Sequence, residues 1–236
     1  MNSPEPASSP ATARFPGATP FSYECHRCRA CCHDKLIQVN PYEIARLARN
    51  RGCSTTAFIA NFLERGVYLR RVENGACVFL GAEGCTVHPD RPLVCRLYPL
   101  GRHVGSDEAA TYSHAEPHPE TKGVYGHQGT MADYVARQGV APFAAAADRY
   151  LAVLQKLFDA WRAELSDEQS HPDNVASAAS EEKIYHAPPP DLSDLDRAVA
   201  DYCQRRGISE PHDIEERMNL HLAAITEWLG SSGTGE

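Results

Sequence analysis

Seven of the nine cysteines in this 236-residue chain lie between positions 25 and 95, and this concentration limits the fold more than any other feature. Two residues between cysteines let one turn direct both sulfur atoms at a single ion, while backbone amides donate to the thiolates. A second group follows a hairpin signal and two tight-turn signals, as in loops that complete a metal site from a distance. We therefore expect a domain that folds around a metal. The expected ligands are Cys25, Cys28, Cys31 and Cys32 in the first group and Cys77, Cys85 and Cys95 in the second.

The number of thiols leaves the identity of the metal open. One tetrahedral zinc ion needs four ligands, and one 4Fe–4S cluster needs four cysteines. Seven thiolates fit two zinc ions that share a bridging sulfur, and they also fit one iron–sulfur cluster with three spare thiols. The neighbours Cys31 and Cys32 are expected to be difficult to direct at one ion together. The expected cofactor is therefore Zn²⁺ or an iron–sulfur cluster.

Charged residues near the cysteines indicate how such a site could be neutralised. Thiolate centres with zinc or iron carry net negative charge, so they need cations nearby. Arg91 and Arg96 are the expected cofactor-binding cations, and Arg96 directly follows Cys95. The whole chain has a formal net charge of −8. This balance argues against general nucleic-acid binding, because phosphate backbones attract basic surfaces.

Other cysteine chemistries fit the pattern less well. A thioredoxin-like site uses one Cys-x-x-Cys after a strand, whereas this motif precedes any expected strand and is repeated. Covalent haem needs Cys-x-x-Cys-His, but Arg29 stands where Cys32-His33 would require a cysteine. A structural zinc module without chemistry stays an alternative. Cys53 and Cys203 fall in apparent helices and are expected to be small core residues.

Helix and turn signals predict an α+β fold. Asn40 and Glu43 predict a capping box at a helix start, and Ser54 predicts the start of a second helix. Asn74-Gly75 predicts a hairpin turn. The expected architecture is a small cysteine-rich metal-binding domain with short strands and helices, followed by α-helices. The expected divisions are a disordered tail (1–20), the cysteine-cluster domain (21–130), a helical extension (131–165), a linker (166–190) and C-terminal helices (191–230).

Three further segments carry local predictions. Residues 35–39 predict a short strand. Residues 103–130 contain four histidines and several glycines and prolines, so we expect a long loop that lies against the cysteine cluster. The helical pattern that begins at Met131 is interrupted near Gly139.

The location and partners follow from composition. No apolar run reaches the length of about 18 residues that a membrane span needs. The first ten residues have neither the basic start nor the apolar centre of a secretory signal. We therefore expect a cytoplasmic protein that does not bind membranes. The C-terminal helices are the expected docking surface for a protein partner.

The combined cysteine pattern resembles the YkgJ-type family. The resemblance rests on the Cys-x2-Cys-x2-Cys-Cys start, on Cys77 and Cys85, and on the block Arg91–Pro99, and it covers about residues 21–105. Its domain, called CxxCxxCC, is described as chelating zinc or iron. The family includes flagellin lysine N-methylases, so the resemblance offers protein lysine methylation as one activity. The chain has no Gly-rich strand–helix fingerprint of the kind that often binds a methyl donor.

The chain departs from this family in one segment. Many relatives carry a further cysteine after the Arg-Pro block, whereas residues 114–119 contain none. His118 is the expected replacement ligand, with His114 as the alternative, because imidazole suits both zinc and iron. A solvent-exposed histidine loop without ligands is the simpler reading of the same segment.

These observations predict a metal-binding protein whose reaction is unassigned. Protein lysine N-methyltransferase activity is one alternative, and a purely structural zinc module for protein interaction is the other. Whether the chain is an enzyme stays open from the sequence alone.

Overall fold

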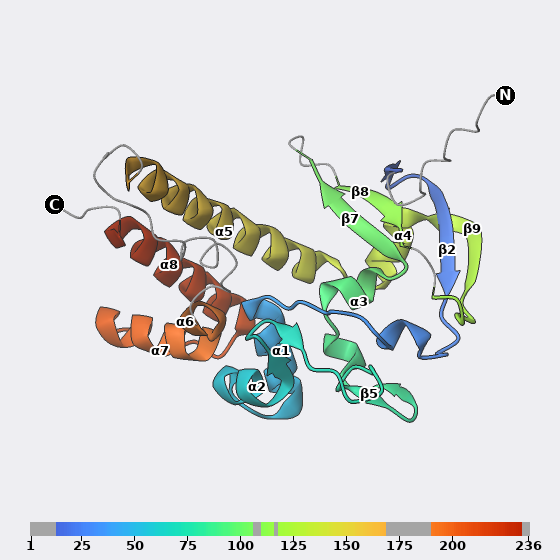
Figure 1. The fold of residues 1–236 in the computed structure, drawn as a ribbon, viewed down its shortest axis with the longest axis horizontal. Coiled ribbons are helices and arrows are strands. Elements are labelled where there is room, and N and C mark those ends of the chain that lie inside the picture. The colour runs from blue at the N-terminus through green and yellow to red at the C-terminus, as the bar shows by residue number, and fades with distance from the viewer. Residues whose placement is uncertain (1–12, 106–109, 116–117, 169–189, 233–236) are drawn as a thin grey trace. The chain divides into compact units, whose positions relative to one another are not determined.

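The computed structural model describes residues 13–105, 110–115, 118–168 and 190–232 (Figure 1). The described residues form helices and short antiparallel strands in small sheets, so the predicted α+β class is confirmed. Two compact units divide it: unit 1 comprises Met1–Ile37 and Arg71–Phe143, and unit 2 comprises Gln38–Arg70 and Ala144–Glu236. The sequence-based division placed residues 38–70 with the cysteines, but the structure places them in unit 2. Compactness does not test independent folding, so the predicted domain limits stay a prediction.

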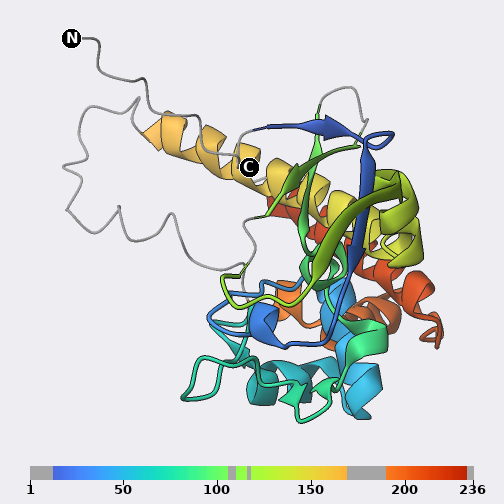
Figure 2. The same cartoon turned by 90° about the vertical axis from the view of Figure 1, so that its right-hand side faces the viewer.

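Unit 1 is built on small antiparallel sheets. One sheet has the strand order β1-β8-β7, and a second pairs β2 with β9, as the neighbouring ribbons in Figure 2 show. A short hairpin joins β5 to β6. The strands are β1 (Phe15–Pro16), β2 (Pro20–Glu24), β5 (Leu80–Gly81), β6 (Gly84–Cys85), β7 (Leu100–Val104), β8 (Ala110–His114) and β9 (Val124–Thr130).

These strands correct two sequence predictions. Residues 103–130 contain β8 and β9, so the prediction of a long loop is wrong for the residues of these two strands. Every β9 side chain is exposed or half-buried, and the strand contains Gly126 and Gly129, so it lacks the apolar alternation that marks a strand. The predicted disordered tail is also wrong at its end, because Phe15 and Pro16 pair with β8. Residues 1–12 of that tail lie outside the described residues.

The core of unit 1 forms where β2 meets α4 (Met131–Arg137). Phe21 and Met131 are buried, and the ring of Phe21 meets the ring of Tyr134 edge-on at 5.2 Å. Thr130 caps α4, with Asp133 completing a capping box. The predicted interruption near Gly139 is confirmed, because α4 ends at Arg137 and α5 (Ala141–Glu168) begins after it.

Unit 2 begins with two helices whose predicted starts are confirmed. Asn40 and Glu43 form a capping box at the start of α1 (Pro41–Arg51). The Ser54 side chain accepts a bond from the backbone of α2 (Thr55–Phe62). A two-stranded sheet of β3 (Leu63–Glu64) and β4 (Tyr68–Leu69) follows.

The C-terminal helices pack on α1 and α2. Thr55 and Thr56 donate their hydroxyls to the two carboxylate oxygens of Asp194, each at 2.5 Å. Asp196 accepts from the backbone N–H of Thr55 at 2.8 Å and pairs with Arg217 at 2.7 Å. These buried and partly buried bonds explain why residues 38–70 belong with the C-terminal helices. The helices are α6 (Pro190–Ser193), α7 (Leu195–Arg206) and α8 (Ile214–Ser232).

Smaller differences concern two segments. The predicted strand at 35–39 is absent, and only isolated bridges occur here, one at His33 before the segment and one at Gln38 within it. Cys53 lies between α1 and α2 and not in a helix. The predicted linker at 166–190 lies largely outside the described residues. Among the helices that the structure describes, none has both the length and the apolar character that crossing a membrane requires.

Candidate metal centre

The first cysteine group lies on a tightly turned segment that follows β2. Arg27 and Arg29 have φ values of 51° and 68°, and Asp34 has a φ of 54°. A left-handed conformation costs a non-glycine residue about 1–2 kcal/mol, and such strain tends to be found at functional sites. The turn continues into a 3-10 helix, η2 (Ala30–Cys32), which places two cysteines on consecutive residues of a compact coil.

Backbone hydrogen bonds join this segment to the loop that carries the second group. The Cys77 N–H donates to the carbonyl of Cys32 at 2.9 Å, and the Asp34 N–H donates to the carbonyl of Gly75 at 2.9 Å. The predicted Asn74-Gly75 turn is confirmed, with a φ of 79° at Gly75. Its flanking strands are reduced to one bridge, between Arg71 and Cys77. Two segments about 45 residues apart in sequence are thereby held together at the cysteines.

The remaining cysteines are placed by short elements. Cys85 lies in β6, and the side chain of Arg29 donates to the carbonyl of Ala82 at 3.0 Å in the turn before it. Cys95 lies in α3 (Leu93–Leu97), which follows the 3-10 helix η3 (His88–Asp90). All nine cysteines of the chain are free thiols, with Cys25 exposed.

The thiols in unit 1 are close enough to influence one another's ionisation. A hydrogen bond from Cys32 lowers the pKa of Cys31 to about 7. Donating that bond raises the pKa of Cys32, and burial and the charges of Cys31, Cys95 and Cys85 raise it further. Burial raises the pKa of Cys77, and the charge of Cys85 adds to this rise. Five cysteines from both groups therefore share one region of unit 1.

The two outer cysteines of the first group lie at its edge. The backbone N–H of Lys122 lowers the pKa of Cys28, while the charge of Cys31 opposes that change. Burial raises the pKa of Tyr23 to about 12, and the charges of Cys25 and Cys31 contribute to this rise. Cys25 and Cys28 thus border the five inner cysteines on the side of β2 and β9.

One pair of donors has the spacing of a thiolate-bound metal. A zinc ion with four thiolates at about 2.3 Å has sulfur atoms separated by about 3.8 Å, and the Sγ atoms of Cys31 and Cys32 lie 4.0 Å apart. This distance is compatible with one shared ion, but the expectation that the two neighbours are difficult to direct at one ion stays a prediction. Among the described residues, no three His, Cys, Asp or Glu side chains already form a set that could hold a metal ion. The thiols are gathered, and their soft sulfur donors suit zinc and iron–sulfur centres.

The two expected cations have different roles in the geometry. Burial raises the pKa of Cys85, and the positive charge of Arg91 opposes that rise, so Arg91 lies within electrostatic reach of a thiol. Arg96 is buried and donates to the carbonyls of Arg91, Gln138 and Pro89. Its guanidinium lies 3.9 Å from the ring centre of Phe143. Arg96 therefore fixes the α3 segment that carries Cys95, and Arg91 supplies charge nearer the thiols.

The expected histidine ligands are engaged by neighbouring groups. The Nδ1 atom of His118 accepts the backbone N–H of Glu120 at 3.1 Å. A neutral imidazole that accepts at Nδ1 carries its proton on Nε2, so neither nitrogen then offers a lone pair to a metal. His114 packs edge-on against the rings of Phe15 and Phe21 at 5.3 and 5.5 Å. The ligand role of His118 stays a prediction that would require its turn to rearrange.

Cys53 and Cys203 belong to unit 2. Cys53 is half-buried, and its thiol faces the carbonyl of Ala48 at 3.7 Å. Cys203 is 2% exposed and packs with Leu195 and Val199. Cys203 has the environment of a small core residue, whereas Cys53 is only half-buried and outside the core, and both lie outside unit 1.

A group of tyrosines next to the cysteines was missed in the sequence. The ring of Tyr23 meets the rings of Tyr98, Tyr125 and Tyr134 edge-on, at 5.9, 5.0 and 6.4 Å. Tyr134 also donates its hydroxyl to the carbonyl of Tyr98 at 2.5 Å. The positions of Tyr23 and Tyr98, two and three residues from a cysteine, could have indicated this aromatic wall.

Comparison with known proteins agrees with the cysteine pattern. Residues 24–117 match the family model CxxCxxCC, described as a "Putative zinc- or iron-chelating domain". The matched segment contains all seven cysteines of the two groups, so the resemblance to this domain is confirmed and metal binding is supported. No curated protein and no solved structure is significantly similar to the chain.

Proposed function

We propose that the chain binds zinc or an iron–sulfur cluster through the seven cysteines of unit 1. The observation that carries the proposal is the convergence of both cysteine groups, with Cys32 joined to Cys77 through the backbone and its Sγ atom 4.0 Å from that of Cys31. Arg27 and Arg29 also have strained, left-handed backbone conformations. Cysteines that were merely buried as uncharged thiols would not require this strain, whereas functional sites often contain it. The proposed ligands are Cys25, Cys28, Cys31, Cys32, Cys77, Cys85 and Cys95.

Electrostatic couplings link four of the seven proposed ligands. Cys32 is influenced by Cys31, Cys85 and Cys95, and Cys85 is in turn influenced by Cys31. Four thiolates are the number that either a zinc ion or a 4Fe–4S cluster needs, and seven match two zinc ions that share a bridging sulfur. Cys77 adjoins the set through Cys85.

The chain's own residues would support this site in distinct ways. Arg91 would offset thiolate charge near Cys85, and Arg96 would hold the position of Cys95 through three backbone carbonyls. When bound, zinc would supply a structural crosslink, whereas an iron–sulfur cluster would supply electron transfer. No observation specifically favours lysine methylation, so the proposal is limited to metal binding.

Metal analysis with optical spectroscopy tests the proposal. Protein purified without oxygen should contain stoichiometric metal: up to about two zinc ions without visible absorption, or about four irons with equal acid-labile sulfide and visible absorption. Cys53→Ser is the matched control, because this thiol lies outside unit 1 and its variant should retain wild-type metal content. Wild-type protein that acquires neither metal nor cluster after reconstitution contradicts the proposal.

A further inference from the structure

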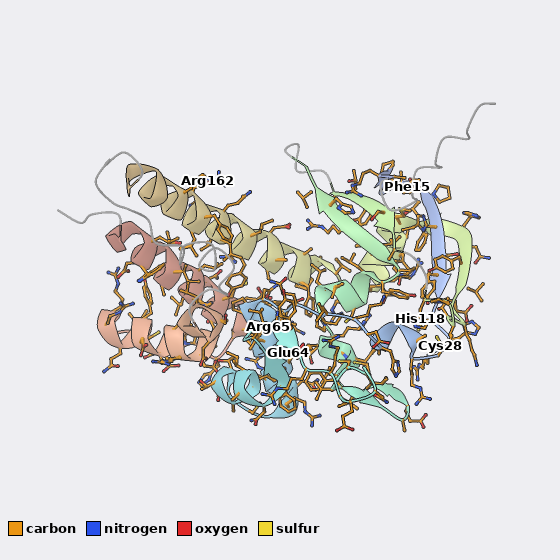
Figure 3. All side chains as sticks on the ribbon, in the orientation of Figure 1. Phe15, Cys28, Glu64, Arg65, His118 and Arg162 are labelled. Carbon is orange, nitrogen blue, oxygen red and sulfur yellow. The ribbon has the colours of Figure 1, made fainter. Side chains whose placement is uncertain are left out.

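A short segment before β9, residues 118–123, lies against Cys28, and we call it the strap. The backbone N–H of Lys122 donates to the Sγ of Cys28 at 3.5 Å, across 94 residues of sequence. Figure 3 labels Cys28 and His118, the first residue of the strap, and the two lie at the same end of unit 1. The N–H of Ala30 also contributes to the lowered pKa of Cys28, but it comes from the same turn as the thiol. The side chain of Thr121, in the same strap, also lowers this pKa, so Lys122 is the backbone donor that the distant segment supplies.

Internal hydrogen bonds give the strap a defined shape. The N–H of Thr121 donates to the carbonyl of His118 at 2.8 Å, and the N–H of Glu120 donates to the His118 ring at 3.1 Å. The N–H of Gly123 donates to the hydroxyl of Thr121 at 3.2 Å. The strap therefore presents the Lys122 N–H from a hydrogen-bonded turn and not from an irregular loop.

The strap is fixed on its other side by Tyr23. A Cβ atom at Gly123 would lie 2.1 Å from the hydroxyl oxygen of Tyr23 and 2.4 Å from its ring, so only glycine fits there. A hydrogen bond from Thr121 also acts on the Tyr23 hydroxyl. Beyond the strap, Val124 pairs with Glu24, directly before Cys25. The strand that leads into the cysteines, β2, is therefore paired directly with the strand that follows the strap, β9.

We propose that the strap is a positioning element for the metal centre, holding Cys28 by the N–H of Lys122 while Tyr23 locks the strap through Gly123. The inference rests on the proposed function, since Cys28 must be a ligand for its sulfur to need positioning. Amide hydrogen bonds to metal-bound thiolates orient the ligand and stabilise its charge, and losing such a partner typically lowers metal affinity by about 10–100-fold. The role belongs to the backbone of residue 122, so it does not depend on the lysine side chain.

The direct test uses cadmium-loaded wild-type protein. Cadmium replaces zinc at thiolate sites and is visible by NMR, so a proton–cadmium correlation reports a hydrogen bond that runs through a ligating sulfur. We expect such a correlation at the amide of Lys122. Bound cadmium without a correlation at this amide overturns the strap proposal and leaves the metal-binding function intact. Protein that binds no cadmium overturns the metal-binding function instead.

A pair of variants at one position supplies the matched test. Lys122→Pro removes the N–H, and Lys122→Ala retains it while removing the charge. Metal release to a chelator should be about 10–100-fold faster in Lys122→Pro and within about twofold of wild type in Lys122→Ala. Equal release from the two variants would contradict a backbone role. The wild-type cadmium spectrum decides the matter if Lys122→Pro fails to fold.

Variants at the lock complete the test. Gly123→Ala should accelerate metal release because its Cβ displaces Tyr23, whereas the double variant Gly123→Ala with Tyr23→Ala should release metal no faster than Tyr23→Ala alone. Additive effects of the two substitutions would show that Tyr23 and Gly123 act separately, and would overturn the lock.

Discussion

The backbone N–H of Cys77 donates to the carbonyl of Cys32 at 2.9 Å, so the last cysteine of the first group is bonded directly to the first cysteine of the second. The contact forms only if the strained turn around Arg29 and the Asn74-Gly75 turn adopt their positions together. Little secondary structure supports either segment, since one bridge joins Arg71 to Cys77 and another joins His33 to Ala76. A metal between the two groups would therefore stabilise the same contact that brings them together.

Removal of the metal should loosen this part of unit 1. Structural zinc contributes about 10–16 kcal/mol of apparent binding free energy, comparable to or larger than the stability of a small domain. With a strong chelator, we expect faster amide exchange across residues 25–34 and 71–95, including the amide of Cys77. The helices α7 and α8 of unit 2 should retain their protection. Unchanged exchange across both cysteine segments would show that the metal is not structural.

Serine substitutions should separate the ligands from the other cysteines. Cys28→Ser and Cys95→Ser should abolish metal binding or reduce it strongly, because serine is a poor ligand for soft metals. Cys53→Ser and Cys203→Ser should keep the wild-type metal content, although Cys203→Ser places a hydroxyl in a buried cluster and should lower stability by about 1–3 kcal/mol. Metal content per chain is the measurement. A loss at Cys53 equal to that at Cys95 would mean that the site is assigned wrongly.

A histidine variant tests the remaining expected ligand. The bond from the Glu120 N–H to Nδ1 of His118 ties this ring to the strap. His118→Ala should therefore retain metal binding and release metal only a few-fold faster, through a less rigid strap. Chelator competition at pH 7 compares it with Cys28→Ser. A loss of affinity as large as that of the cysteine variant would show that His118 rearranges and ligates the metal.

Local signals in the sequence predicted local structure well. The capping box of Asn40 and Glu43, the cap at Ser54 and the Asn74-Gly75 turn each depend on residues within a few positions of one another. Because the residues that form these structures are neighbours in the sequence, the sequence alone was enough to predict them.

Contacts between distant segments were not predictable in the same way. β9 has little apolar alternation and forms because β2, about 100 residues earlier, supplies its partner. The position of the strap at Cys28 depends on this pairing. The group that reaches the thiol is the backbone N–H of Lys122, and because every residue except proline carries such a group, the sequence contained no signal for it. The cysteines could be identified as a group because their residue type is rare, but their mutual order in space depends on η2 and on the turn at Gly75. The protein partner expected at the C-terminal helices stays a prediction.

A buried histidine in unit 2 predicts how stability depends on pH. His221 is fully buried, and its Nδ1 atom lies 2.9 Å from the hydroxyl of Tyr150. Its Nε2 atom has no hydrogen-bond partner within the part of the chain that the structure describes. Burial lowers the pKa of His221 to about 4, and the charge of Asp194 opposes this change only in part. The unfolded chain, with a histidine pKa near 6.5, therefore takes up the proton first.

The sign of the effect follows from this order of protonation. Above a pH of about 6.5 both states are neutral at His221 and its contribution does not vary, whereas between about 6.5 and 4 the unfolded state is stabilised increasingly by its proton. Lowering the pH from 7 to 5 should reduce the free energy of unfolding of unit 2 by about 2 kcal/mol. Urea titrations that follow the NMR signals of α8 measure this change. His221→Phe is the control, because it fills the same site without titrating, and its unfolding free energy should lack this component. Equal pH dependence in the variant and the wild type would assign the effect to other groups of unit 2.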